Sequence, residues 1–312
     1  MEPSRNHRRE SRPMQRSKPQ SASGPQRSAP PPAVSGRWLL GAIAITVPAA
    51  AFCAWAVLCL LFWQGSWQLL YHPSSAVTRT PASAGIAFES VDFAVTAGGA
   101  TQMRGWWIPR EQARYTAIYL HGADGNLGDT VDDLSPLYGA GMSVFAFDYR
   151  GYGLSTFKRP SEANLRQDAE SAIEYLTQTR HVPAGSLVLV GRGLGANLAL
   201  EAAAAHPELA GLVLDDPLPA PADTIFADPR ARLVPAHLLV RDRWDPDPHA
   251  ASLRIPSLWI YRTTLPGDAE KRTREAYRLV TARKEQVWLV QSTDQTKTYY
   301  DTLSRWLDDL HR

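Results

Sequence analysis

Cysteine is almost missing from this chain of 312 residues. The two cysteines, Cys53 and Cys59, both lie inside one long apolar run near the N-terminus, and none follows it. The rest of the chain therefore has no disulfide, no thiol nucleophile and no cysteine-ligated zinc. This scarcity fits either side of a membrane, so it does not identify a redox compartment.

Histidine is also scarce, with eight residues in the whole chain and no pair at the spacing of metal ligands on a helix. We therefore predict no metal site and no cofactor. The glycine-rich stretch Gly191–Gly195 reads Gly-x-Gly-x-Gly, which differs from the dinucleotide pattern Gly-x-Gly-x-x-Gly. It also lacks an acidic residue at the distance that a ribose contact requires.

Charge is distributed unevenly, although the net charge is only +2. Residues 1–37 hold eight Lys/Arg and two Asp/Glu, or +6, which leaves 25 Lys/Arg and 29 Asp/Glu, or −4, for the remainder. Because the folded part is mildly acidic, we predict no nucleic-acid partner. Residues 1–37 are rich in Arg, Ser, Pro and Gln, so we predict a disordered basic tail.

One apolar run follows this tail, and no charged residue occurs from Trp38 to Tyr71. A helix over Trp38–Phe62 would be about 37 Å long, more than the roughly 30 Å hydrocarbon core of a bilayer. We predict a transmembrane signal anchor over 38–63 and a linker over 64–85. The basic tail places the N-terminus in the cytoplasm and the folded domain on the opposite face, which is periplasmic if the source is bacterial. A buried core helix and a cleaved signal peptide are the alternatives.

Residues 86–312 alternate between short apolar, β-rich runs and segments of helical periodicity. The predicted strands are Ile86–Val95, Thr101–Ile108, Tyr115–Leu120, Ser143–Phe147, Leu187–Val190, Leu212–Leu214, Ser257–Tyr261 and Gln286–Val290. The predicted helices are Asn126–Tyr138, Ser161–Gln178, Leu194–Ala205, Ala269–Ala282 and Thr296–Leu310. This alternation predicts an α/β fold with a mostly parallel eight-stranded sheet and helices on both faces. The ligand site of such a sheet lies beyond the carboxyl ends of its strands.

Three motifs follow the third, fourth and fifth predicted strands, in this order. They are His121-Gly122-Ala123-Asp124-Gly125, Asp148-Tyr149-Arg150-Gly151-Tyr152-Gly153 and Gly191-Arg192-Gly193-Leu194-Gly195. Together with Tyr71-His72-Pro73 after the apolar run, they resemble the α/β-hydrolase superfamily, in particular its membrane-anchored, serine-aminopeptidase-like branch. The resemblance covers about residues 70–310 and implies the α/β-hydrolase fold. It also implies a lid in the proline-rich segment 217–248.

The resemblance implies a catalytic serine between the two outer glycines of Gly191–Gly195, at a sharp strand-to-helix turn. Gly193 occupies that position, so no hydroxyl can form an acyl-enzyme there. Because glycine suits a turn with positive φ better than serine does, we expect Gly193→Ser to lower stability without restoring activity.

The other two catalytic positions also depart from the family. An aspartate is expected after the seventh strand, where the chain has Arg262, Thr263 and Thr264; Asp215, Asp216 and Asp268 are the displaced acids that stay open. A histidine is expected after the eighth strand, where residues 291–297 contain none. Without an imidazole near pKa 6.5, a proton shuttle at neutral pH has no carrier there.

The oxyanion hole depends on backbone amides, which the resemblance places at Ala123 and Leu194. We predict that these amides persist as a vestigial oxyanion hole able to bind a carbonyl or carboxylate group. We interpret His121, Gly122, Gly191, Gly195, Asp148 and Arg150 as residues of the motif turns, kept for folding. We expect Arg192 to be a surface or helix-capping residue, with an anionic ligand contact as the alternative.

The sequence therefore predicts a membrane-anchored pseudohydrolase that acts in binding or interaction with an unknown protein or small molecule. One alternative is an active esterase, lipase or peptidase that uses unrecognised residues, with Ser155 and Ser292 as candidate nucleophiles. Another is a small-molecule receptor that uses the vestigial pocket below the lid.

Overall fold

The computed structural model describes residues 35–96, 98–262, 267–289 and 294–310. The predicted tail over 1–37 lies almost wholly outside them, as do Thr263, Thr264 and Ser292. The chain divides into two compact units, Met1–Phe52 and Cys53–Arg312. The described part of the first unit is the beginning of helix α1.

Helix α1 (Gly36–Gly65) continues into a short 3₁₀ turn, η1 (Ser66–Leu69). The stretch Gly36–Leu69 is long and apolar enough to cross a membrane, with a mean hydropathy of 2.3 over its most apolar window. Only 6% of that window is buried. This exposure contradicts the alternative of a core helix, whose side chains would be packed against other elements.

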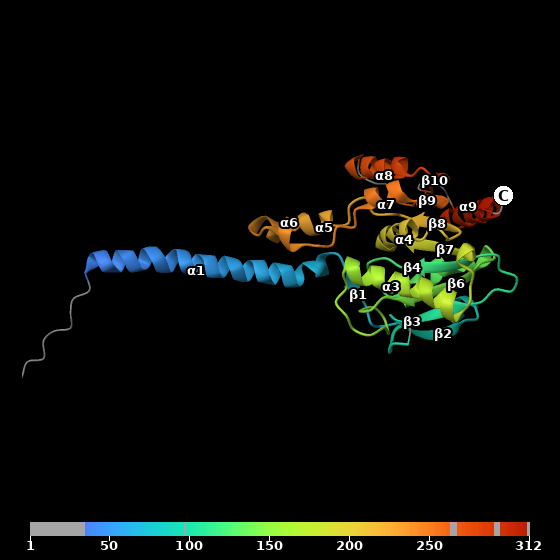
Figure 1. The fold of residues 1–312 in the computed structure, drawn as a ribbon, viewed down its shortest axis with the longest axis horizontal. Helices are drawn as coiled ribbons and strands as arrows, with labels where there is room; N and C mark the ends of the chain where they lie inside the picture. Colours follow the sequence, from blue (N-terminus) through green and yellow to red (C-terminus); the bar gives the residue numbers. More distant parts are fainter. Residues whose placement is uncertain (1–34, 97, 263–266, 290–293, 311–312) are drawn as a thin grey trace, which may run out of the picture. The chain divides into compact units, whose positions relative to one another are not determined.

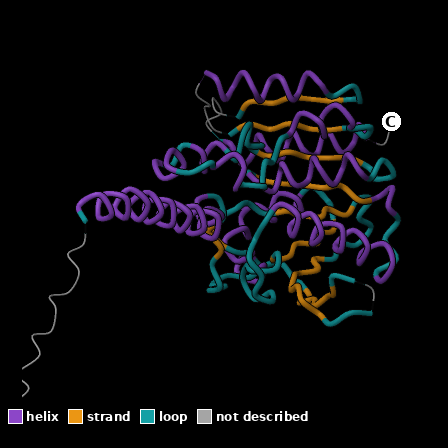
Figure 2. The backbone as a smooth tube through the Cα atoms, turned by 60° about the vertical axis from the view of Figure 1, so that its left-hand side comes forward, coloured by secondary structure: helices purple, strands orange, loops and turns teal. Residues whose placement is uncertain are grey.

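The second unit contains the predicted eight-stranded sheet, in the order β10-β9-β8-β7-β4-β6-β3-β2. Strands β2 and β3 are antiparallel to their neighbours, and the remaining neighbours pair in parallel. Figure 2 shows these strands side by side. The bounds are β2 (Glu89–Ala94), β3 (Thr101–Ile108), β4 (Thr116–Leu120), β6 (Ser143–Asp148), β7 (Leu187–Arg192), β8 (Gly211–Asp215), β9 (Ser257–Tyr261) and β10 (Lys284–Trp288). The predicted fold class is confirmed.

Helices cover both faces of this sheet because its central strands are apolar on both sides, and β4, β8 and β9 are buried along their whole length. One face packs against α2 (Val131–Gly139) and α9 (Gln295–Leu310) through the core around Val131 and Leu303. The other face packs against α3 (Glu162–Glu174), α4 (Leu194–Ala205), α7 (Pro246–Ser252) and α8 (Gly267–Leu279) (Figure 1).

The predicted lid segment, between β8 and β9, consists of short helical pieces. They are α5 (Asp223–Phe226), η6 (Pro229–Leu233) and α6 (Ala236–Leu239), followed by α7. Prolines at positions 221, 229, 235, 246 and 248 interrupt the segment, which explains why no helix in it is long. Its role as a lid stays a prediction.

Three local features differ from the predictions. The helix predicted over Ser161–Gln178 ends as α3 at Glu174 and continues as one π-helical turn, η4 (Tyr175–Thr179). The helix predicted over Asn126–Tyr138 begins as the 3₁₀ turn η3 (Leu127–Thr130), whose N-terminus is closed by a capping box between Asn126 and Asp129. A second, two-stranded sheet pairs β1 (His72–Pro73) with β5 (Asp124–Gly125). Two other 3₁₀ turns are η2 (Pro81–Ala84) and η5 (Ala184–Ser186).

Candidate functional site

The sharp turn between β7 and α4 has a backbone conformation at its central residue, Gly193, that most residues do not adopt. Gly193 has φ +57° and ψ −122°, a region that only glycine enters without strain. Its N–H donates to the carbonyl oxygen of Asp215 at 2.9 Å, and its own carbonyl accepts from Ala196 N at 3.1 Å. Hydrogen bonds to β8 and to α4 thus fix the backbone of Gly193.

The two outer glycines of this turn are required by close contacts. A Cβ on Gly191 would lie 2.1 Å from the carbonyl oxygen of Gly195, and a Cβ on Gly195 would lie 2.1 Å from that of Leu120. A Cβ on Gly193, in contrast, would meet no atom within 4 Å. The turn therefore has room for a side chain at its centre and at neither flank.

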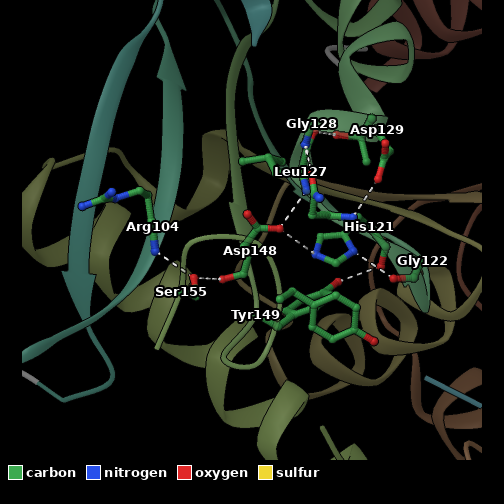
Figure 3. Close-up of polar contacts among 12 residues, drawn as sticks. Arg104, His121, Gly122, Leu127, Gly128, Asp129, Asp148, Tyr149 and Ser155 are labelled. Atoms are coloured by element: carbon green, nitrogen blue, oxygen red, sulfur yellow. Dashed lines mark hydrogen bonds and ion pairs between the residues drawn. The ribbon is translucent and has the colours of Figure 1, made fainter. Parts of the chain in front are cut away.

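The loop after β4, which carries the Ala123 amide, is held by hydroxyl groups from the Asp148–Gly153 motif. Tyr149 Oη donates to the carbonyl of His121, and Tyr152 Oη donates to that of Ala123, each at 2.9 Å. Figure 3 shows Tyr149 beneath this loop. In the described part of the chain, the amides of Ala123 and Leu194 donate to no protein acceptor. The loop that carries the Ala123 amide is therefore fixed by two tyrosine hydroxyl groups.

The Tyr71-His72-Pro73 motif holds the same loop from a second direction. His72 N donates to the carbonyl of Ala123 at 2.9 Å, and strands β1 and β5 pair in parallel. His72 Nδ1 also lies 2.6 Å from Asp124 Oδ1. The sequence associated this motif with a family but not with this contact, since pairing between strands of two residues leaves no periodic pattern.

His121 and Asp148 form a buried pair behind the loop (Figure 3). His121 Nε2 lies 3.6 Å from Asp148 Oδ1 and has no hydrogen-bond partner, while Nδ1 contacts the carbonyl of Gly122 at 2.8 Å. Burial lowers the pKa of His121 to about 4 and raises the pKa of Asp148 to about 7. The ring faces the protein interior, so His121 is not placed to act as a base at Gly193.

The remaining polar groups in and beside the Asp148–Gly153 motif stabilise the loop that follows β6. Asp148 Oδ1 accepts from Leu127 N at 2.7 Å, and Arg150 Nε lies 2.5 Å from the buried carboxylate of Asp168. Ser155 Oγ donates to the carbonyl of Asp148 at 2.7 Å and accepts from Arg104 N at 3.0 Å (Figure 3). With both its donor and an acceptor site occupied by backbone, the Ser155 hydroxyl is not an activated nucleophile.

Arg262 lies in the segment where the resemblance implies the catalytic acid. Arg262, directly after β9, donates through Nε to Asp215 Oδ1 at 2.8 Å, and its backbone N donates to Asp216 Oδ1 at 2.7 Å. Burial raises the pKa of Asp215 to about 6, against the opposing effect of the Arg262 charge. Arg262 thus engages two of the three displaced acids, Asp215 and Asp216. The third, Asp268, lies exposed at the start of α8.

Arg192, within the turn, has a side chain that is 40% exposed, in line with a surface residue. Its guanidinium pairs with Asp133 of α2 and caps no described helix. Asp133 also accepts from Tyr119 Oη at 2.9 Å, and the guanidinium of Arg262 lies 4.5 Å from the ring centre of Tyr299. Two ion pairs, a hydrogen bond and a cation–π contact thus connect the strand ends with α2 and α9. Tertiary pairs of this kind connect distant positions, which explains why the sequence did not indicate them.

One further histidine, His206, is bound by two carboxylates away from the turn. His206, at the other end of α4, lies 2.5 Å from Glu170 and 2.7 Å from Glu208, which raises its pKa to about 9. Ser292 and its loop fall outside the described residues. Within the described ranges, no group of three His, Cys, Asp or Glu side chains is arranged to hold a metal ion.

Comparisons with known sequences identify relatives of this chain. The family model for serine aminopeptidase S33 matches residues 111–284, more than half of the chain. The protein Rv2307c of Mycobacterium tuberculosis is 30% identical over 207 residues, which are 64% of this chain and 70% of that protein. YfhR of Salmonella typhi is 38% identical over 138 residues, 42% of this chain and 45% of YfhR. The aligned part therefore spans less than half the length of YfhR.

Solved structures share the fold at low sequence identity. The Pyrococcus furiosus esterase Pf2001 superimposes with a TM-score of 0.59 and 17% identity, covering 77% of this chain and 98% of the esterase. The α/β hydrolase GrgF of a Penicillium species superimposes with a TM-score of 0.57 and 18% identity, covering 72% of this chain and 98% of GrgF. With its sheet order, its glycine turn and its family match, this chain belongs to the serine aminopeptidase S33 family of α/β-hydrolase-fold proteins.

Proposed function

We propose that this protein is a membrane-anchored pseudohydrolase, which keeps the hydrolase fold for binding or interaction and does not turn over substrate. The observation that carries the proposal is Gly193, which occupies the nucleophile position with the right backbone and no hydroxyl. A covalent acyl intermediate needs an attacking atom at this point. Arg262 at the acid position removes the partner that would orient a catalytic imidazole.

A receptor for a small molecule is the second candidate, and the vestigial oxyanion hole favours it. The amides of Ala123 and Leu194 have no protein acceptor in the described structure, and the space above Gly193 is open. Two N–H donors beside an empty position suit a carbonyl or carboxylate oxygen. The ligand of such a receptor would carry that group and would be released unchanged.

The active-hydrolase alternative has little support from the described residues. The Ser155 hydroxyl is bonded to backbone groups on two strands, and the His121 ring is buried against Asp148. A serine and a histidine facing each other beside the two amides would be needed for acyl transfer.

The anchoring part of the proposal rests on helix α1. Its apolar length exceeds the hydrocarbon core of a bilayer, and the basic residues 1–37 precede it. We propose a single-pass arrangement with the N-terminus in the cytoplasm and the folded domain on the opposite face, periplasmic in a bacterium.

A substrate panel tests the proposal. The purified full-length protein in detergent is offered short-chain p-nitrophenyl esters and aminoacyl anilides, with an active serine hydrolase as positive control. We expect hydrolysis no faster than in buffer with detergent. Turnover that survives repurification and is lost after heat unfolding would establish an active enzyme and refute the proposal.

A further inference from the structure

We propose that the segment Pro229–Arg243, here called the tip segment, is a second membrane-contacting element. In this arrangement its leucines insert into the leaflet through which α1 leaves the bilayer, and its arginines bind the phosphates of anionic phospholipids. The inference rests on the anchoring part of the proposed function and is independent of whether the domain hydrolyses anything.

The tip segment has the composition of an interfacial membrane element. Residues 233–240 read Leu-Val-Pro-Ala-His-Leu-Leu-Val, with Arg230 and Arg232 before them and Arg241 and Arg243 after them. Four arginines and Asp242 give the segment a charge of +3. Apolar residues flanked by arginines suit the boundary between acyl chains and anionic headgroups.

Two leucines of the tip segment are presented to the surroundings instead of the core. Leu238 is 83% exposed and Leu233 is 62% exposed, whereas Ala236 and Val240 between and beside them are buried. The buried residues therefore hold the segment on the protein while the leucines point outward. Two large apolar side chains exposed on one short segment suit a contact surface.

The position of the tip segment along α1 indicates lipid as the occupant of this surface. Trp55 Nε1 donates to the carbonyl of Leu233 at 3.1 Å. Trp55 precedes Trp63 by eight residues, about 12 Å along a helix. Tryptophans at the ends of membrane helices lie at the interface between headgroups and acyl chains. With Trp63 and Trp67 at that interface, Trp55 and the Leu233 carbonyl bonded to it lie at the depth of the acyl chains.

The base of the tip segment is fixed to the residues that follow α1. Tyr71 Oη donates to Asp242 Oδ2 at 2.7 Å and accepts from Trp244 Nε1 at 2.9 Å, and Tyr71 is buried. Arg159 Nη2 donates to the carbonyl of Trp63 at 3.0 Å from the neighbouring loop. These contacts set the height of the segment relative to the end of the helix.

A groove between α1 and the tip segment has the lining that an acyl chain requires. Its volume is about 230 Å³, and it is lined mainly by apolar side chains, with Ser66 and Arg230 as the polar ones. The apolar lining residues are Leu58, Leu61, Phe62, Leu69, Leu233 and Val234. Arg230 is paired with Asp228, while Arg232 and Arg241 form no ion pair with another described residue and are available to phosphate.

Depth-dependent quenching tests the insertion in the full-length protein. In a Cys53→Ala/Cys59→Ala background, Leu238→Cys and the control Leu279→Cys are each labelled with the fluorophore NBD. The proteins are reconstituted into vesicles of equal parts phosphatidylcholine and phosphatidylglycerol, with or without lipids that carry a doxyl quencher on the acyl chain. Leu279 is a suitable control because it is an exposed leucine at the end of α8, outside the tip segment.

We expect the label at Leu238 to be blue-shifted and strongly quenched by the doxyl lipids, and the label at Leu279 to be neither. Arg232→Gln/Arg241→Gln should weaken the quenching at Leu238 in these vesicles and leave it unchanged in pure phosphatidylcholine. Equal, water-like spectra at the two positions would refute the insertion. A blue shift without doxyl quenching would also refute it, because protein and not lipid would then cover the leucine.

Membrane extraction separates this inference from the proposal on which it rests. If sodium carbonate releases the protein from membranes, the anchor itself is wrong, and the tip insertion is refuted with it. If the protein resists carbonate but the Leu238 label lies in water, the anchor stands and the tip insertion alone is wrong.

Discussion

The candidate site has two halves, one that would supply backbone amides and one that would transfer protons, and they differ in how far they match the resembled family. The amide half, formed by the turn at Gly191–Gly195 and the loop of Ala123, has a positive φ at Gly193 and tight backbone contacts at both outer glycines. The proton-transfer half, which the resemblance implies on the segments after β9 and β10, has Arg262, Thr263 and Thr264 at the expected acid position and no histidine over residues 291–297.

This difference follows from how each half is bound into the fold. The glycine turn joins a central strand to α4, and its carbonyls and Cα atoms are in contact with the loop after β4. A change there would disturb the core of the sheet. In the resembled family the acid and the base lie on connections that follow strands, and positions on such connections tolerate replacement better than core positions do. The hydrolase backbone is therefore maintained by folding, whether or not catalysis persists.

The largest effect is expected from Gly195→Ala. The added Cβ would lie 2.1 Å from the carbonyl oxygen of Leu120 and 2.3 Å from that of His121, and neither backbone group can move without distorting β4. We expect a loss of about 4 kcal/mol or more in the free energy of unfolding, measured by urea titration. The control is Gly85→Ala, at a glycine with positive φ and open space; an equal loss there would contradict the packing argument.

A smaller loss, about 3 kcal/mol, is expected from Arg262→Met, which leaves the carboxylate of Asp215 buried without its partner. The same titration measures it. The double variant Arg262→Met/Asp215→Asn removes the uncompensated charge and should recover part of the loss. If the double variant is no more stable than the single one, the ion pair is not the reason that Arg262 stabilises the site.

Gly193→Ser should have the smallest effect, a loss of about 1–3 kcal/mol, because serine is strained at φ +57° although its side chain has space. Thermal unfolding compares it with Gly193→Ala, which carries the same backbone strain. We expect the two variants to lose similar stability and neither to hydrolyse esters. A gain in stability for Gly193→Ser would contradict the interpretation that glycine relieves strain at this turn.

Most of the fold could be predicted from the sequence because apolar periodicity reports burial directly. The helix predicted at Leu194–Ala205 is α4 with the same bounds, and the strand predicted at Thr101–Ile108 is β3. The π-helical turn at Tyr175–Thr179 was missed, since one extra residue in a turn hardly alters the apolar pattern.

Less of the site could be predicted, because its contacts join distant residues. The motif residues indicated the glycine turn, and its contacts explain why Gly191 and Gly195 cannot carry side chains. The pairing of Arg192 with Asp133 and of Arg262 with Asp215 had no sequence signal. Charges that meet only through the tertiary fold have no fixed spacing along the chain, unlike pairs on one helix.

The central claim, that no residue of this domain acts as an acyl-transfer nucleophile, is tested most directly by labelling with a fluorophosphonate. The intact mass of the folded full-length protein is measured after incubation with the probe, beside an active serine hydrolase. We predict no adduct on this protein and complete labelling of the control. A single adduct that forms only on the folded protein and maps to one serine would contradict the account.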